Sequence, residues 1–132
     1  MKHCYGFLFT IFIGFFTSAQ DAQFLSDCQQ AYQACPQVPR GVLEAVSFTQ
    51  TRFAYLSDAE LESCSGLPKS HGYLGMVQNG KQFFRSNMRK VADLSGISQT
   101  QIRQQSQQEI LAYAKAFEVV FQESYGDPLP IR

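Results

Sequence analysis

The sequence predicts a mainly α-helical domain in which one glycine-rich loop excursion lies between the helices. Apolar residues recur every three or four positions in several stretches, which is the spacing of one helix face. Two serines are each followed three residues later by Gln or Glu, at Ser98–Gln101 and Ser106–Glu109, a pattern typical of capped helix starts. Between residues 57 and 80 the periodicity fades and four glycines and a proline occur, which indicates irregular backbone.

Residues 1–19 have the layout of a secretory signal peptide. A basic start at Lys2 leads into an apolar run over residues 5–16, and small residues follow that run. The run has about a dozen residues, whereas a helix that spans a membrane needs about 20. We therefore expect cleavage after Ala19, a secreted or periplasmic protein with no stable membrane insertion, and one mature domain over residues 20–132.

Two helices are expected before the loop. The first covers residues 24–35 and stops before Pro36, because a residue that precedes proline disfavours the helical conformation. The second follows the extended segment at "QVPRG" and includes "LEAVSFTQTRF", residues 43–53, where the apolar spacing is again helical.

Inside the loop a short strand is expected at "YLGMV". After the loop, residues 84–94 form a third helix that ends at Gly96, since glycine commonly terminates helices. The long last helix opens at the Ser106–Glu109 pattern and carries apolar residues on one face as far as Phe121.

One position of the second helix breaks its apolar pattern. In steps of three and four residues, Leu43, Val46, Gln50 and Phe53 fall on one stripe, so an amide lies where an apolar side chain is expected. A glutamine there either bonds a loop carbonyl inside the core, since burying it unpaired costs about 1–3 kcal/mol, or faces a groove. Both interpretations stay open at this point.

The charge and the histidine content exclude some classes of function. Eleven basic and eleven acidic residues cancel, which removes the argument for binding nucleic acid through bulk charge. No two cysteines have the two-residue spacing of a zinc site, and His71 is the only histidine of the expected mature chain. The sequence therefore predicts no nucleic-acid partner, no metal site and no cofactor.

Three cysteines remain after the expected cleavage, and an exported protein meets an oxidising compartment. A bridge between Cys35 and Cys64 would join the two ends of the second helix region. Closing a loop of about 30 residues stabilises the folded state by roughly 3 kcal/mol. Cys28 can substitute for Cys35, since the two lie on the same face of the first helix.

Three segments, in this order, resemble one known family. "GVLEAVSFTQTRF", residues 41–53, resembles the first catalytic helix of the soluble lytic transglycosylases and goose-type lysozymes. "GYLGMVQ", residues 72–78, resembles the stretch that lines the glycan groove in that family, and "EILAYAKAF", residues 109–117, is similar to the helix that closes its core. The chain also resembles the lysozyme-like module that accompanies secreted N-acetylmuramoyl-L-alanine amidases. The resemblance implies a lysozyme-like helical domain, peptidoglycan glycan strands as the ligand and an amidase as a partner.

The resemblance places Gln50 on the catalytic glutamate of the family and Thr51 on its serine. In the family the glutamate protonates the glycosidic oxygen, and glutamine has no proton to exchange in the useful pH range. Losing acid–base help lowers the rate by about 10² to 10⁴. The expected substrate-binding residues are Gln50, Thr51, His71, Tyr73, Gly75 and Gln78.

The sequence thus favours a peptidoglycan-binding module that does not cleave the glycan, rather than an enzyme. An alternative is an active cell-wall hydrolase or lytic transglycosylase in which a loop acid, Asp58, Glu60 or Glu62, replaces the missing one. A second alternative is a disulfide-stapled helical domain that recognises another protein.

Overall fold

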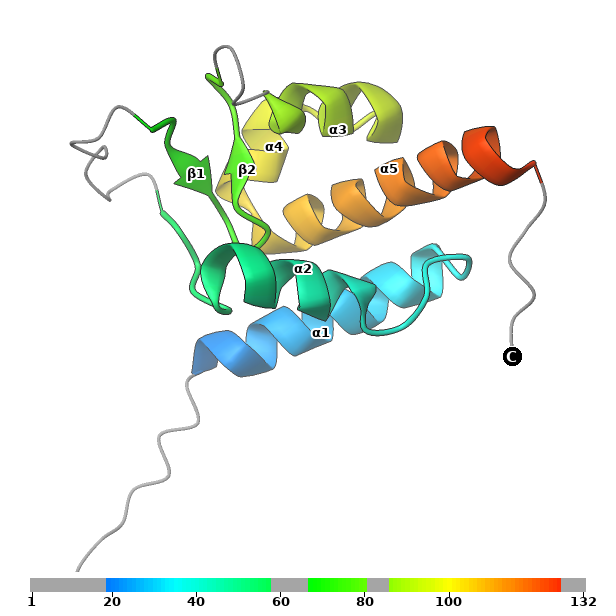
Figure 1. Ribbon diagram of the computed structural model, residues 1–132. Coiled ribbons are helices and arrows are strands. Elements are labelled where there is room, and N and C mark those ends of the chain that lie inside the picture. Colours follow the sequence, from blue (N-terminus) through cyan, green and yellow to red (C-terminus); the bar gives the residue numbers. More distant parts are fainter. Residues whose placement is uncertain (1–18, 58–66, 81–85, 127–132) are drawn as a thin grey trace, which may run out of the picture.

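The computed structural model describes residues 19–57, 67–80 and 86–126. This part of the chain contains five helices and one short antiparallel hairpin (Figure 1). The elements are α1 (Ala19–Ala34), α2 (Val42–Thr51), β1 (Ser70–His71), β2 (Met76–Val77), α3 (Asn87–Ser95), α4 (Gln99–Gln104) and α5 (Ser106–Tyr125). The predicted mainly α fold is confirmed. Residues 1–18 of the expected signal peptide lie outside the described residues.

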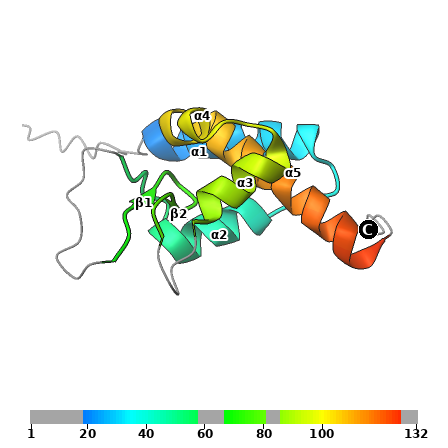
Figure 2. The ribbon, with the colours of Figure 1, turned by 90° about the horizontal axis from the view of Figure 1, so that it is seen from above.

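The long helix α5 is the centre of the packing. α1 packs along one side of α5, and α3 and α4 pack along the other (Figures 1 and 2). Three alanines, Ala112, Ala114 and Ala116, are buried on α5, and such small side chains let neighbouring helices approach closely. No helix in the described ranges combines the length and the apolar character that crossing a membrane requires.

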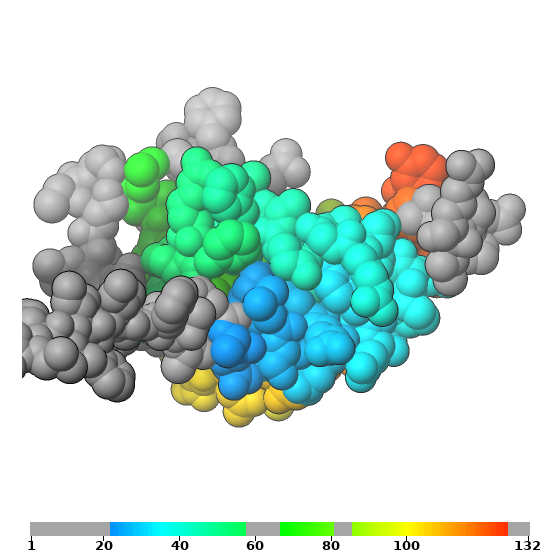
Figure 3. Space-filling view, turned by 90° about the horizontal axis from the view of Figure 1, so that it is seen from below, coloured from blue at the N-terminus to red at the C-terminus, as the bar shows by residue number. Residues whose placement is uncertain are grey.

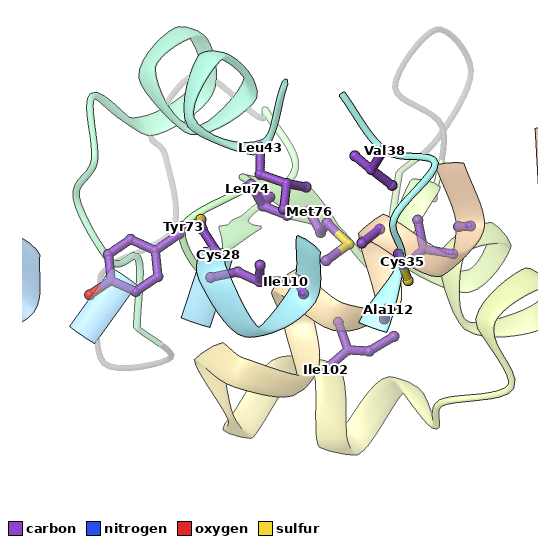
Figure 4. Packing of buried hydrophobic residues seen from close by; sticks show 14 of the residues in the cluster. Cys28, Cys35, Val38, Leu43, Tyr73, Leu74, Met76, Ile102, Ile110 and Ala112 are labelled. Carbon is purple, nitrogen blue, oxygen red and sulfur yellow. The ribbon is translucent and has the colours of Figure 1, made fainter. Parts of the chain in front are cut away.

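The core fills the space between these helices and the hairpin. Figure 4 shows Leu43 of α2, Leu74 and Met76 of the hairpin, and Ile110 of α5 gathered together, and each is at most 2% exposed. Full burial of one such side chain is worth about 1.5–3 kcal/mol. The hairpin is therefore anchored to the helices by its own apolar side chains.

The buried face of α2 differs from the stripe that the sequence suggested. The buried residues are Leu43, Ser47 and Thr51, four positions apart, whereas Gln50 is exposed and Phe53 is 36% exposed. Two of the three buried residues are polar, so apolar spacing alone pointed to the wrong face. The interpretation of Gln50 as a core amide is wrong.

The predicted helix ends are partly right. α1 stops before Pro36, and Gly96 ends α3 in the left-handed conformation at φ 71°, both as expected. The second helix ends earlier than predicted, at Thr51, because Arg52 and Phe53 take left-handed φ values of 56° and 65°. A left-handed backbone is uncommon for residues other than glycine.

Of the two predicted capping boxes, one is confirmed. Ser98 and Gln101 bond each other's backbone N–H at the start of α4. The second is wrong: the N-cap of α5 is Gln105, and Ser106 instead donates to Asp27 Oδ2 at 2.7 Å. The Glu109 carboxylate instead accepts hydrogen bonds from backbone N–H groups of the hairpin turn.

Cys28 and Cys35 are both buried, and their sulfurs are not bonded to each other. Burial is the main reason why the pKa of each thiol is raised, to about 12 for Cys28 and about 11 for Cys35. Such thiols react slowly with solutes. Cys64 lies outside the described residues, so the Cys35–Cys64 bridge stays a prediction.

Candidate functional site

The turn between the two strands, residues 72–75, lies at the centre of the expected site and is held by several contacts. Ser70 pairs with Val77 and His71 with Met76, and a further bridge joins Gly72 to Leu56. The turn depends on Gly72 and Gly75, whose φ values are 72° and 61°. Only glycine adopts such angles without steric cost.

A buried carboxylate holds this turn from below. Glu109 of α5 is 1% exposed, and its two oxygens accept the backbone N–H groups of Tyr73 at 2.9 Å and Leu74 at 2.8 Å. A Cβ atom at Gly72 would lie 2.1 Å from Glu109 Oε2, closer than any real contact. Two independent reasons therefore require glycine at position 72: the positive φ angle, and the lack of space for a Cβ beside the Glu109 carboxylate.

Burial also changes the acid strength of Glu109. Removing the carboxyl from water raises its pKa to about 7, and the bonds from Leu74 and Tyr73 oppose that rise because they favour the ionised form. The group is enclosed and turned toward backbone donors, so it is a support for the turn rather than an acid that a ligand can reach.

Sequence reasoning missed this role of Glu109. Glu109 is not on the apolar face that the spacing of the last helix predicts, so nothing in the sequence indicated that it is buried. The capping-box pattern offered a local explanation that concealed it. The partners are turn amides about 35 residues earlier in the chain, which no local pattern reveals.

Thr51 connects α2 to the same turn. Its hydroxyl lies 2.7 Å from the carbonyl oxygen of Tyr73 and 3.1 Å from that of Ser47. Because the Thr51 side chain is 8% exposed, it has little surface to offer a ligand. It fixes the end of α2 against the turn.

Gln50 and Gly75 are in contact at this junction, and Gly75 is buried there. A Cβ at Gly75 would lie 3.0 Å from Gln50 Cβ and 3.5 Å from Thr51 Cγ2, so the helix packs on the bare glycine backbone. Gln50 itself is exposed. The structure thus brings an accessible amide onto a turn that is fastened by Glu109 and Thr51.

The other three expected binding residues contribute differently. Tyr73 is 3% exposed and packs its ring 4.9 Å from Phe24 and 5.1 Å from Tyr55, centroid to centroid. His71 is also buried. Gln78 is half-buried and accepts a hydrogen bond from Arg103 Nη1 at 3.2 Å, which ties the end of the hairpin to α4. Tyr73 and His71 therefore present little surface to a ligand.

Sequence reasoning also missed an exposed aromatic pair at the end of α2. Phe48 is 48% exposed and Phe53 is 36% exposed, and their ring centroids are 5.6 Å apart. The guanidinium of Arg52 lies 4.4 Å above the Phe48 ring, a favourable cation–π geometry. The left-handed backbone at Arg52 and Phe53 brings these groups together.

The structure does not describe the alternative catalytic acids that the sequence suggested. The acids proposed as replacements for the missing one, Asp58, Glu60 and Glu62, lie outside the described residues. Within the described ranges no three or more metal-ligating side chains gather in one place. Comparisons with protein-family models, with curated proteins and with solved structures found no match to this chain.

Proposed function

We propose that this chain is a lysozyme-like saccharide-binding module that holds a peptidoglycan glycan strand against the exposed Gln50, which packs on Gly75 of the turn, without cleaving it. The observation that carries the proposal is the exposed Gln50 side chain, whose Cβ and Cγ pack on the glycine of a turn that Glu109 and Thr51 hold in place. An amide both donates and accepts hydrogen bonds, as sugar hydroxyl and acetamido groups do. Because Glu109 and Thr51 already hold the turn in the free protein, little conformational entropy is lost when a sugar binds.

The exposed aromatic pair at the end of α2 is a further surface that suits a sugar ring. Sugar rings have apolar faces that stack on aromatic rings, and Phe48 and Phe53 are both partly exposed at the end of α2. Polar groups that fix orientation beside an apolar surface are typical of small-ligand sites.

The acid–base chemistry of Gln50 and Glu109 supports binding without cleavage. Gln50 cannot donate a proton to a leaving oxygen. Glu109 is enclosed under the turn and already accepts two backbone N–H bonds. Glycoside hydrolysis normally needs two carboxyl groups on either side of the scissile bond.

The proposal also includes export of the protein from the cytoplasm and an amidase as its partner. A chain that binds peptidoglycan works in a periplasm or outside the cell, in agreement with the signal-like residues 1–19. An amidase that cuts the peptide part of the wall is the partner that the family resemblance suggests.

Co-sedimentation with purified peptidoglycan sacculi tests the proposal. We expect the mature protein to sediment with sacculi without lowering their turbidity, and Gln50→Ala to reduce the bound fraction at least threefold. The matched control is Gln107→Ala, which removes an exposed helical amide far along the chain, bonded to Gln30. Clearing of the sacculi would instead support the hydrolase alternative, and neither binding nor clearing would favour the protein-recognition alternative.

A further inference from the structure

A hollow lined by polar and apolar side chains of α1 and α2 lies away from the junction of Gln50 and Gly75. Figure 3 shows the face of the molecule on which these two helices lie side by side. The hollow has a volume of about 260 Å³. Its lining residues are Leu25, Gln29, Tyr32, Gln33, Arg40 and Glu44.

The lining residues follow from helix periodicity. Leu25, Gln29 and Gln33 are four positions apart, so they form one row along α1. Arg40 lies two residues before α2, and Glu44 lies in the first turn of α2. The α1 side of the hollow thus has amides and an apolar end, and the α2 side has two opposite charges.

Several of these groups have unused hydrogen-bonding capacity. Within residues 19–57, 67–80 and 86–126, the amides of Gln29 and Gln33 have no hydrogen-bond partner and the guanidinium of Arg40 has no ion pair. Arg40 can donate five N–H bonds in a planar fork that suits a carboxylate. Arg40 is exposed at the edge of the hollow, where a solute can reach it.

Glu44, on the same side of the hollow as Arg40, is held in place by Tyr32. The Tyr32 hydroxyl donates to Glu44 Oε2 at 2.5 Å and accepts the backbone N–H groups of Gly41 at 2.9 Å and Leu43 at 3.2 Å. The tyrosine hydroxyl is thereby saturated, whereas the carboxylate uses one of about four acceptor positions. Glu44 is half-buried, so a cation in the hollow would meet a partly desolvated charge.

We infer that this hollow binds a small zwitterion, an α-amino acid or the equivalent dipeptide, with its carboxylate on Arg40, its ammonium on Glu44 and an apolar side chain on Leu25. Each charged group of the ligand then meets a protein side chain of opposite charge. The amides of Gln29 and Gln33 match the polar edges of the backbone of the ligand. This inference does not depend on glycan binding, because it uses none of the residues around Gln50.

Amide chemical-shift titration with leucine is the first test. Leucine should shift resonances of residues 25–44, whereas N-acetylleucine and leucinamide, which each lack one charge, should bind at least tenfold more weakly. A charge-assisted hydrogen bond is worth about 1.5–3 kcal/mol, or roughly 10- to 100-fold in affinity. Leucyl-leucine distinguishes the source: tighter binding than leucine indicates a peptide, and weaker binding indicates a free amino acid.

Substitutions make the test specific. Arg40→Gln and Glu44→Gln should each weaken leucine binding at least tenfold. Arg89→Gln, on the exposed side of α3, should leave it unchanged. Arg40 precedes the helix and is exposed, so Arg40→Gln keeps the fold even if Glu44→Gln disturbs the bond to Tyr32. The inference is overturned if millimolar leucine and leucyl-leucine shift nothing in residues 25–44, or if Arg40→Gln binds leucine as well as the unchanged protein.

Discussion

Glu109 shows how one buried residue can determine the shape of a surface that it never touches. Its carboxylate takes two backbone N–H groups of the turn, which water would otherwise have to satisfy. Leaving those donors unpaired in the interior would cost about 1–3 kcal/mol each. The position of Gln50 above the turn therefore depends on an acid on the other side of it.

The pKa of Glu109 predicts a pH-dependent stability. Burial raises it to about 7 from an ordinary 4.5, so the folded state binds a proton more readily than the unfolded state. The stabilisation is fully present below about pH 4.5 and is lost as the pH rises through 7. We expect the free energy of unfolding to fall by up to about 3 kcal/mol from this group between those pH values.

Urea unfolding of the unchanged protein and of Glu109→Gln, measured from pH 4.5 to 8, checks this. Other titrating groups largely cancel in the difference between the two proteins. Glu109→Gln should be less stable at pH 4.5, because its NH₂ group cannot accept a turn amide, and its stability should depend less on pH, so that the difference between the two proteins narrows as the pH rises to 8. Parallel pH profiles for the two proteins would contradict the role given to Glu109.

At the scale of elements, the meeting of the hairpin turn with α2 and α5 requires glycine at two positions. Gly75 lies under α2, where Gln50 and Thr51 leave no room for more than a slightly displaced Cβ. Gly72 lies against the Glu109 carboxylate, where no Cβ fits. The side chains that crowd a Cβ at these two glycines are those of Glu109, Gln50 and Thr51, so the close packing of polar residues on the turn imposes the glycines.

Gly72→Ala should therefore destabilise the protein strongly. A left-handed φ costs an alanine about 1–2 kcal/mol, and the displacement of Glu109 should add at least about 2 kcal/mol. The matched control is Gly96→Ala, at a nearly equal φ of 71° but with no atom within 4 Å of the new Cβ. Urea unfolding should give a cost near 1–2 kcal/mol for Gly96→Ala and a clearly larger one for Gly72→Ala; equal costs would mean that the contact with Glu109 is unimportant.

At the scale of the whole molecule, the sequence predicts the helices better than their faces. The helix at 87–95 and the long helix at 106–125 follow from apolar spacing, and Pro36 and Gly96 mark real ends. The face of α2 was missed because its buried residues include Ser47 and Thr51, whose hydroxyl groups find partners that periodicity ignores. Burial of polar groups depends on distant partners, which a single sequence does not reveal.

The candidate site was likewise only partly predictable. The family resemblance named both Gln50 and Gly75 among the expected binding residues, and the structure brings the two into contact. The burial of Tyr73 was not expected, because a tyrosine in a glycine-rich loop gives no local sign of the Phe24 and Tyr55 rings that enclose it.

The most direct test of glycan binding is an amide chemical-shift titration with a soluble N-acetylglucosamine tetrasaccharide, which carries the repeating acetamido sugar of the wall without its peptides. We expect the largest shifts at Gln50, Gly75 and the neighbouring Arg52 and Phe53, with no cleavage of the sugar during the titration. Shifts confined to other surfaces, or none at all at millimolar sugar, would contradict the assignment of Gln50 as a saccharide-binding residue.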